Sequence, residues 1–192
     1  MKRLFGLIGN NLEYSFSKHY FEEKFKKEKI SNTRYINLQI ENINHLKKII
    51  QKNTISGFNV TIPFKIDIIS FLDDITKEAK EIGSVNTVKL KEGNMKGYNT
   101  DVIGFKESII PLIKNRKKAL ILGNGGSSKT VQYVLSNINI EYTIVSRGTV
   151  FDYHNIDSQI IDCHDIIINT TPLGMFPNTK ESPQIPYQLL NK

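Results

Sequence analysis

The sequence predicts an α/β protein, with an N-terminal α/β domain built on a mostly parallel sheet and a Rossmann-like domain after it. Two observations carry this prediction. Short apolar segments typical of buried strands alternate with amphipathic helical segments along the chain. A glycine-rich turn, 123–130, lies between one such apolar segment and a helical one, which is the usual setting of a phosphate-binding turn.

The first half alternates strands and helices. The predicted strands are 4–8, 35–38, 57–62, 85–90 and 95–98. The last two form a hairpin, because Glu92-Gly93-Asn94 between them is a typical turn sequence. Helices are predicted from about Ser17, from about Ile43 and from Pro63, since proline suits the first turn of a helix.

The second half repeats the pattern around a short parallel sheet. A helix over about 102–115 leads to predicted strands at 119–122, 141–145 and 165–169, with a helix through Leu135 after the glycine turn. We expect a domain boundary near Gly104, which gives a substrate-binding catalytic domain over 1–104 and a dinucleotide-binding domain over 105–192.

Composition excludes several classes of protein. The net charge is +7, but the lysines alternate with glutamates, as on a solvated helix face, so we expect an anionic small-molecule partner and no nucleic acid. The single cysteine, Cys163, excludes an internal disulfide and a cysteine-based zinc site. No apolar run approaches the ~18 residues that span a bilayer, so we expect a cytoplasmic protein without a membrane partner.

The glycine-rich turn nearly fits two phosphate-binding motifs. As Gly-x-Gly-x-x-Gly or as the P-loop Gly-x-x-x-x-Gly-Lys-Thr, it has Ser128 where the last glycine belongs. A small serine can replace the glycine that packs helix against strand in a dinucleotide turn, but the P-loop backbone tolerates serine poorly. The strand 165–169 also ends in Asn169, not in an acid that could help to hold magnesium. We therefore interpret the turn as a dinucleotide site.

The residue after the strand 141–145 bears on the choice of cofactor. Ser146 and Arg147 stand where a carboxylate would bind the 2′-hydroxyl of NAD. An arginine attracts the 2′-phosphate of NADP instead, which favours NADP. The alternative is that Arg147 is only a surface cation.

Polar residues gather after the strands of the first half. Ser15 and Ser17 follow the first strand, the run 59–65 ends the third, and Asn86 and Asp101 lie near later strand ends. Ligands of open α/β sheets bind at such ends. Each feature alone also has a structural explanation, as a helix cap or a solvated side chain.

Together the motifs resemble a known family. Ser-x-Ser, Asn-Val-Thr-x-Pro-x-Lys, Val-Asn-Thr, Asn-Thr-Asp-x-x-Gly, Gly-x-Gly-Gly and Asn-Thr-Thr-Pro-Leu-Gly-Met occur in the order found in shikimate dehydrogenases and cover nearly the whole chain. The runs 57–65 and 169–175 are the specific ones. The resemblance implies reduction of 3-dehydroshikimate to shikimate with NADPH, without a metal, by a monomer or homodimer with a substrate domain and an NADP-binding domain.

The resemblance also implies roles for individual residues. Lys65 would polarise the carbonyl and pass the proton that its oxygen gains, with Asp101 orienting the lysine. The residues implied to bind substrate are Ser15, Ser17, Thr61, Lys65, Asn86, Thr100 and Asp101. Those implied to bind the cofactor are Gly123, Asn124, Gly125, Gly126, Ser127, Ser146, Arg147, Thr170 and Met175.

The chain departs from the family pattern in four places. Lys18 replaces a proline after Ser-x-Ser, and Ser146-Arg147-Gly148 replaces the usual Asn-Arg-Thr. Phe151 stands where a second basic residue is common, which weakens the expected preference for NADP over NAD. The family continues beyond the segment matching 182–191, so we expect a C-terminally incomplete cofactor domain, from a fragment or a shortened member. Two other functions stay open: a non-catalytic NADP-binding descendant, and a relative that acts on quinate.

Overall fold

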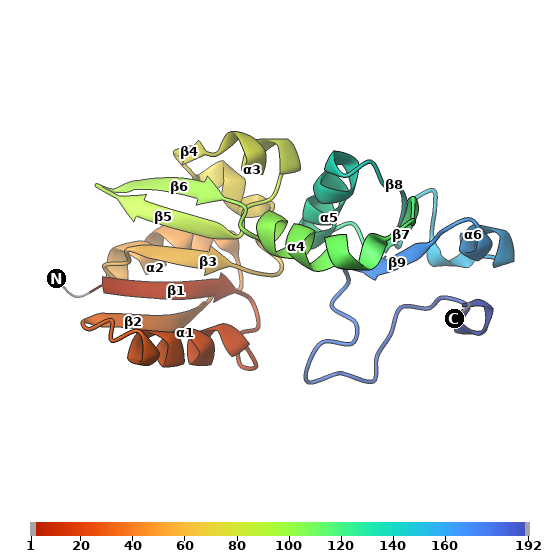
Figure 1. Cartoon of the computed structure of the whole chain (residues 1–192). Coiled ribbons are helices and arrows are strands. Elements are labelled where there is room, and N and C mark those ends of the chain that lie inside the picture. The colour runs from red at the N-terminus through yellow and green to blue at the C-terminus, as the bar shows by residue number, and fades with distance from the viewer. Residues whose placement is uncertain (1–2, 191–192) are drawn as a thin grey trace. The chain divides into compact units, whose positions relative to one another are not determined.

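The chain folds as two α/β units, as the sequence predicts. The computed structural model describes residues 3–190 and divides between Thr100 and Asp101. Each unit has its own sheet (Figure 1). Each also has its own apolar core. None of the described helices is long and apolar enough to cross a membrane.

The first unit contains a six-stranded mixed sheet in the order β2-β1-β3-β5-β6-β4. Three strands at one side are parallel: β1 (Arg3–Gly9), β2 (Thr33–Gln39) and β3 (Gly57–Val60). The remaining strands are β5 (Thr87–Lys91), β6 (Asn94–Tyr98) and β4 (Asp74–Ile75). Because β5 runs antiparallel to both β3 and β6, the sheet is mixed rather than uniformly parallel.

Alternating side chains send apolar groups to both faces of this sheet. On one face, α1 (Phe16–Lys27) packs through Phe21 and Phe25 against Phe5 and Tyr35. The opposite face carries the larger core, to which η1 (Ile43–His45), α2 (Leu46–Lys52), η2 (Asp67–Phe71) and α3 (Lys77–Ile82) contribute. A strand that is apolar on both faces is suited to an interior position, and β1 lies between β2 and β3.

The β5–β6 hairpin is confirmed, with its turn at Glu92 and Gly93. Both residues have positive φ, 53° and 83°. A two-residue turn of this kind matches the twist of antiparallel strands and favours glycine.

The helix predicted from Pro63 is wrong. After β3 the chain forms turns, and the next helical element is the short η2. The carbonyl of Lys65, which a continuing helix would use, instead accepts a hydrogen bond from the Val85 backbone at 2.8 Å. Phe64 and Ile68 are buried in the core, so tertiary contacts fix this segment in place of helix propagation.

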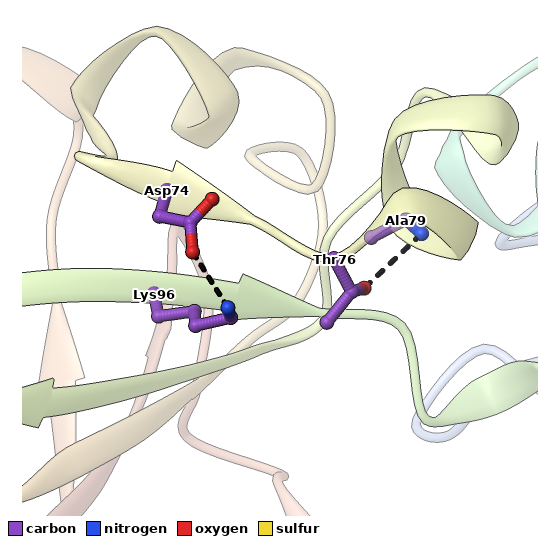
Figure 2. Close-up of polar contacts among 4 residues, drawn as sticks. All are labelled: Asp74, Thr76, Ala79 and Lys96. Carbon is purple, nitrogen blue, oxygen red and sulfur yellow. Dashed lines mark hydrogen bonds and ion pairs between the residues drawn. The ribbon is translucent and has the colours of Figure 1, made fainter.

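Two elements that the sequence analysis did not predict, β4 and α3, follow this segment. The two-residue strand β4 pairs with β6, and the Asp74 carboxylate lies 2.6 Å from the Lys96 ammonium (Figure 2). The Thr76 hydroxyl accepts a hydrogen bond from the Ala79 backbone and caps α3. Gly83, in the left-handed conformation, ends this helix.

The second unit contains a three-stranded parallel sheet in the order β8-β7-β9. Its strands are β7 (Lys118–Leu122), β8 (Glu141–Val145) and β9 (Ile166–Asn169). The helices are α4 (Asp101–Ile113), α5 (Gly126–Asn137) and α6 (Ser158–Asp162), with short turns η3 (Tyr153–Asn155) and η4 (Tyr187–Leu189). The central strand β7 is almost fully buried from Ala119 to Leu122, since core clusters cover both of its faces.

Candidate active site

Five polar side chains of the first unit form a connected cluster on β2, on β3, around the start of β5 and just after β6: Tyr35, Asn59, Asn86, Thr87 and Thr100. The Tyr35 hydroxyl donates to Asn59 Oδ1 at 2.8 Å, and Asn59 Nδ2 donates to Thr87 Oγ1 at 3.0 Å. Thr87 Oγ1 donates in turn to Asn86 Oδ1 at 3.1 Å. The bonds form a continuous chain through the cluster.

Asn86 is the centre of the polar cluster. Its Oδ1 accepts a hydrogen bond from the Thr100 backbone at 2.8 Å, and its Nδ2 donates to Thr100 Oγ1 at 2.9 Å. Only 7 % of Asn86 is exposed. A buried amide with both ends engaged is held in one orientation, so the sheet presents a preorganised set of donors and acceptors.

The register of the sheet assembles the cluster. Asn59 of β3 and Thr87 of β5 lie directly opposite each other in the antiparallel pair. Tyr35 reaches Asn59 from β2, with its ring stacked on Phe21 at 4.4 Å between centroids. Burial raises the pKa of Tyr35, so the phenol stays protonated and acts as a donor.

Thr61 and Lys65 follow β3 at its carboxyl end. The Thr61 backbone donates to the Ile8 carbonyl at 2.8 Å, which holds the segment against the end of β1. Lys65 is partly buried, and its carbonyl is bonded to Val85 as described above. The backbone that carries both side chains is therefore fixed by β1 at Thr61 and by the segment just before β5 at Lys65.

Ser15 and Ser17 lie at the start of α1. Ser15 is the residue that caps the helix, since its Oγ accepts from the Ser17 backbone at 3.3 Å. Of the two serines, Ser15 is therefore the helix cap. Both hydroxyls are partly buried and follow β1.

Asp101 is the first residue of α4 and opens the second unit. It directly follows Thr100, the last residue of the polar cluster and of the first unit. The predicted carboxylate is therefore next to the polar cluster in the sequence. It also lies at the start of a helix, where a negative charge is favoured.

Sequence reasoning named Asn86 and Thr100 but missed Tyr35, Asn59 and Thr87 as members of the cluster. Asn59 and Thr87 lie inside the runs Asn-Val-Thr and Val-Asn-Thr, so their polarity at strand positions was the available signal. Tyr35 carried no such signal, because a tyrosine in an apolar strand is typical of a core residue.

The glycine turn of the second unit follows β7. Gly123 has φ of +106°, and a Cβ there would lie 2.8 Å from Thr170 Oγ1, so the fold itself requires glycine. Gly125 differs, because its φ is −85° and a Cβ would have no atom within 4 Å. An extended backbone facing open space leaves room for a ligand group, which fits a pyrophosphate at the start of α5.

The other residues of the turn are also consistent with a dinucleotide-binding turn. Asn124 is exposed, while Gly126 and Ser127 form the first turn of α5 and are partly buried. Ser128 is fully buried and accepts from Gln132 Nε2 at 3.0 Å, as expected for a small residue between helix and strand. Thr130 is 2 % exposed, a position unsuited to holding magnesium as a P-loop threonine does.

The remaining predicted cofactor residues follow β8 and β9. Ser146 is partly buried and Arg147 exposed in the loop after β8. After β9, the Thr170 hydroxyl donates to the Leu122 carbonyl at 2.7 Å, and Met175 is 55 % exposed. All these loops leave the carboxyl ends of parallel strands, where open α/β sheets bind ligands.

The side chains and cavities of the described residues bear on which ligands the chain can hold. Among residues 3–190, no group of three or more His, Cys, Asp or Glu side chains could hold a metal ion. A cavity of about 240 Å³ in the first unit is lined by Asn59 and Thr87 but mainly by aromatic and other apolar residues from β1, β2, β3 and α1. These walls suit an apolar group better than an anionic ring acid.

Comparison with known proteins places these features in one family. The sequence profile described as "Shikimate dehydrogenase substrate binding domain" matches residues 7–88. The shikimate dehydrogenase (NADP(+)) of Methanococcus vannielii is 39 % identical, over 95 % of this chain and 72 % of the relative.

Solved structures agree with this comparison. Shikimate dehydrogenase 1 of Peptoclostridium difficile has a TM-score of 0.84 at 37 % identity, over 94 % of this chain and 71 % of that one. A shikimate dehydrogenase solved in complex with NADP+ has a TM-score of 0.76 at 33 % identity, over 95 % and 71 %. The chain therefore spans more than two thirds of the length of each relative.

Proposed function

We propose that this chain, which belongs to the shikimate dehydrogenase family, interconverts 3-dehydroshikimate and shikimate with NADP(H). The polar cluster around Asn86 is the single observation that carries the proposal. A polyhydroxylated ring acid offers hydroxyl groups that both donate and accept hydrogen bonds. A buried amide with fixed orientation, flanked by threonine hydroxyls, suits such a ligand.

Substrate binding is assigned to residues on three elements. Asn86 and Thr100 would meet ring hydroxyls from the polar cluster, and Thr61 would do so from the end of β3. Ser15 and Ser17 would bind the carboxylate, since hydroxyl and backbone donors at the start of a helix favour an anion.

Proton transfer is assigned to Lys65, with Asp101 as the residue that orients it. Reduction of a carbonyl requires that its oxygen gain a proton, and a lysine ammonium can both polarise the carbonyl and donate that proton. The Lys65 backbone is held by Val85, two residues before β5, so the stem of the side chain begins at a fixed point.

The cofactor residues are those of the three loops at the carboxyl ends of β7, β8 and β9. Gly123, Asn124, Gly125, Gly126 and Ser127 would bind the pyrophosphate, Ser146 and Arg147 the adenosine ribose with its 2′-phosphate, and Thr170 and Met175 the nicotinamide half. When bound, NADPH supplies the hydride. The open space at Gly125 supports this assignment.

The activity assay that tests the proposal is oxidation of shikimate by this chain with NADP+, followed through the absorbance of the reduced cofactor. Quinate in place of shikimate tests the relative that prefers that ring acid. A second protein, extended with the C-terminal segment of a relative, runs beside it in the same assay.

Each outcome separates the candidates. Turnover by the chain alone supports the proposal as stated, and turnover by the extended protein only would show that the added segment is needed for activity. Faster oxidation of quinate than of shikimate would reassign the substrate. No turnover by either protein, together with NADP+ binding in calorimetry, would favour a non-catalytic descendant.

A further inference from the structure

The loop after β8, residues 146–152, is closed by its own hydrogen bonds. The Ser146 backbone donates to the Phe151 carbonyl at 3.2 Å. The Thr149 hydroxyl lies within hydrogen-bond distance of two acceptors that share its one proton, the Ser146 carbonyl at 2.8 Å and the Phe151 carbonyl at 2.9 Å. Arg147 and Gly148 therefore lie on a short, internally braced turn, and the position of each backbone group in it is fixed.

The Asp152 carboxylate is built into this loop. Its Oδ2 accepts from the Gly148 backbone at 3.1 Å, its Oδ1 accepts from the Tyr153 backbone, and its own N–H donates to Asn155 Oδ1 at 2.7 Å. The bonds from Tyr153 and Gly148 lower the pKa of Asp152, with smaller contributions from His154 and Arg147. The negative charge of Asp152 is thus held beside Gly148, the residue that follows Arg147.

This placement matters because of what the loop would bind. In a dinucleotide fold, the residues after the second strand meet the ribose, and a carboxylate there favours the 2′-hydroxyl of NAD over the 2′-phosphate of NADP. The positive φ of Gly148, +71°, suits a turn whose N–H groups can bind a phosphate. Here the Gly148 N–H donates to Asp152 instead.

We propose that Asp152 is a specificity-determining residue that opposes Arg147 and narrows the preference for NADP over NAD. The carboxylate acts in two ways. It repels the 2′-phosphate within the screening length of ~10 Å, and it occupies a backbone donor that a phosphate could use. The inference rests on the proposed function only in that the second unit binds a nicotinamide dinucleotide.

Asp165 provides a matched control. Its Oδ2 accepts from the backbones of Lys117 and Lys118 at 2.8 and 3.0 Å, and these two bonds lower its pKa as the corresponding bonds do for Asp152. It lies just before β9, at the amino end of the parallel sheet, whereas the candidate cofactor loops leave the carboxyl end. Asp165→Asn removes the same charge and keeps the same kind of acceptor, but at the opposite end of the parallel sheet from the candidate cofactor loops.

The test measures dissociation constants of NADP+ and NAD+ by calorimetry for the wild type, Asp152→Asn and Asp165→Asn. Asparagine keeps an acceptor for the loop and removes the charge. We expect Asp152→Asn to raise the ratio of NADP+ to NAD+ affinity about fivefold, as loss of one nearby like charge predicts, and Asp165→Asn to leave it unchanged. Asp152→Ser, which is also uncharged, serves as the second variant if the asparagine protein misfolds.

The outcomes separate this inference from the proposed function. If the wild type binds cofactor and neither uncharged variant changes the ratio, Asp152 only braces the loop, and the inference is wrong while the function stands. A ratio that rises equally in Asp165→Asn would show an effect of net charge and also overturn it. If the wild type binds neither dinucleotide, the cofactor assignment itself fails, and the proposed function fails with it.

Discussion

Asn86 in the first unit and Gly125 in the second illustrate two ways of preparing a binding site. Asn86 is buried and its side chain is bonded to others, so the polar cluster is part of the interior of its unit. Gly125 is exposed, and a Cβ added there would have no atom within 4 Å, so no side-chain contact at this position supports the fold. In the first unit, binding and folding depend on the same bonds, whereas in the second a residue can serve the ligand without serving the fold.

The largest effect is expected for a residue that serves chemistry rather than folding. Lys65→Ala should lower kcat for shikimate oxidation by about a thousandfold, because the proton then has no positioned donor or acceptor. Shikimate binding should weaken far less. Steady-state kinetics beside calorimetry measures both quantities, and equal losses would identify Lys65 as a binding group only.

The next effect should appear in stability. Asn86→Ala removes the centre of the polar cluster and leaves buried partners without their bonds, which should cost about 3 kcal/mol of the free energy of unfolding. Urea unfolding measures it, and shikimate affinity should fall in the same variant. Asn124→Ala is the matched change at an exposed amide and should leave the unfolding curve unchanged. A stable Asn86→Ala protein that had only lost affinity would contradict the view that folding and binding share these bonds.

Two glycines of one turn sharpen the comparison within the second unit. Gly123→Ala should destabilise the protein by about 2 kcal/mol, since it combines a left-handed backbone with a Cβ 2.8 Å from Thr170 Oγ1. Gly125→Ala should change stability by less than about 0.5 kcal/mol, yet weaken NADP+ binding about tenfold by filling the space of the pyrophosphate. Thermal unfolding measures the stability of both variants, and calorimetry measures their affinity for NADP+. A Gly125→Ala protein with normal affinity would argue against the turn as the phosphate site.

The smallest effect concerns pH. Two backbone N–H bonds hold the pKa of Asp165 below its ordinary value of 3.8, so the carboxylate stabilises the fold above that pH and loses this contribution as the pH falls through the lowered value. Asp165→Asn should therefore be less stable than the wild type at neutral pH, and the difference should shrink below about pH 3.8. Melting temperatures of both proteins from about pH 2 to about pH 7 measure this difference. A difference that does not change with pH would contradict the prediction.

The parts of the fold that follow from local patterns were predictable from the sequence. Apolar runs such as Ala119–Leu122 indicate buried strands, and Gly93 marks the hairpin turn. The capping signals of α3 were also present, with Thr76 before it and Gly83 after it, but the helix is short and its apolar pattern weak. The predicted helix at Pro63 failed because the bond between Val85 and Lys65 is a tertiary contact that local propensity cannot reveal.

The candidate site was predictable as a set of residues but not as a network. Motifs identified Asn86 and Thr100 individually. The pairing of Asn59 with Thr87 depends on β5 lying next to β3, a neighbour relation that no local pattern specifies. Tyr35 joins the cluster only because β2 and β3 flank β1 in matching register, so the Tyr35 hydroxyl reaches across β1 to Asn59.

The position of β1 has a consequence for the order of events during synthesis. Phe5 pairs with Tyr35 on one side and with Gly57 on the other, so β1 cannot complete its pairing until β3 has emerged from the ribosome. The β5–β6 hairpin joins sequence neighbours and can close within microseconds of its appearance. Until β3 is available, therefore, the apolar strand Arg3–Gly9 keeps one edge unpaired, and an open strand edge of this kind is a site for chaperone binding and for aggregation of a nascent chain.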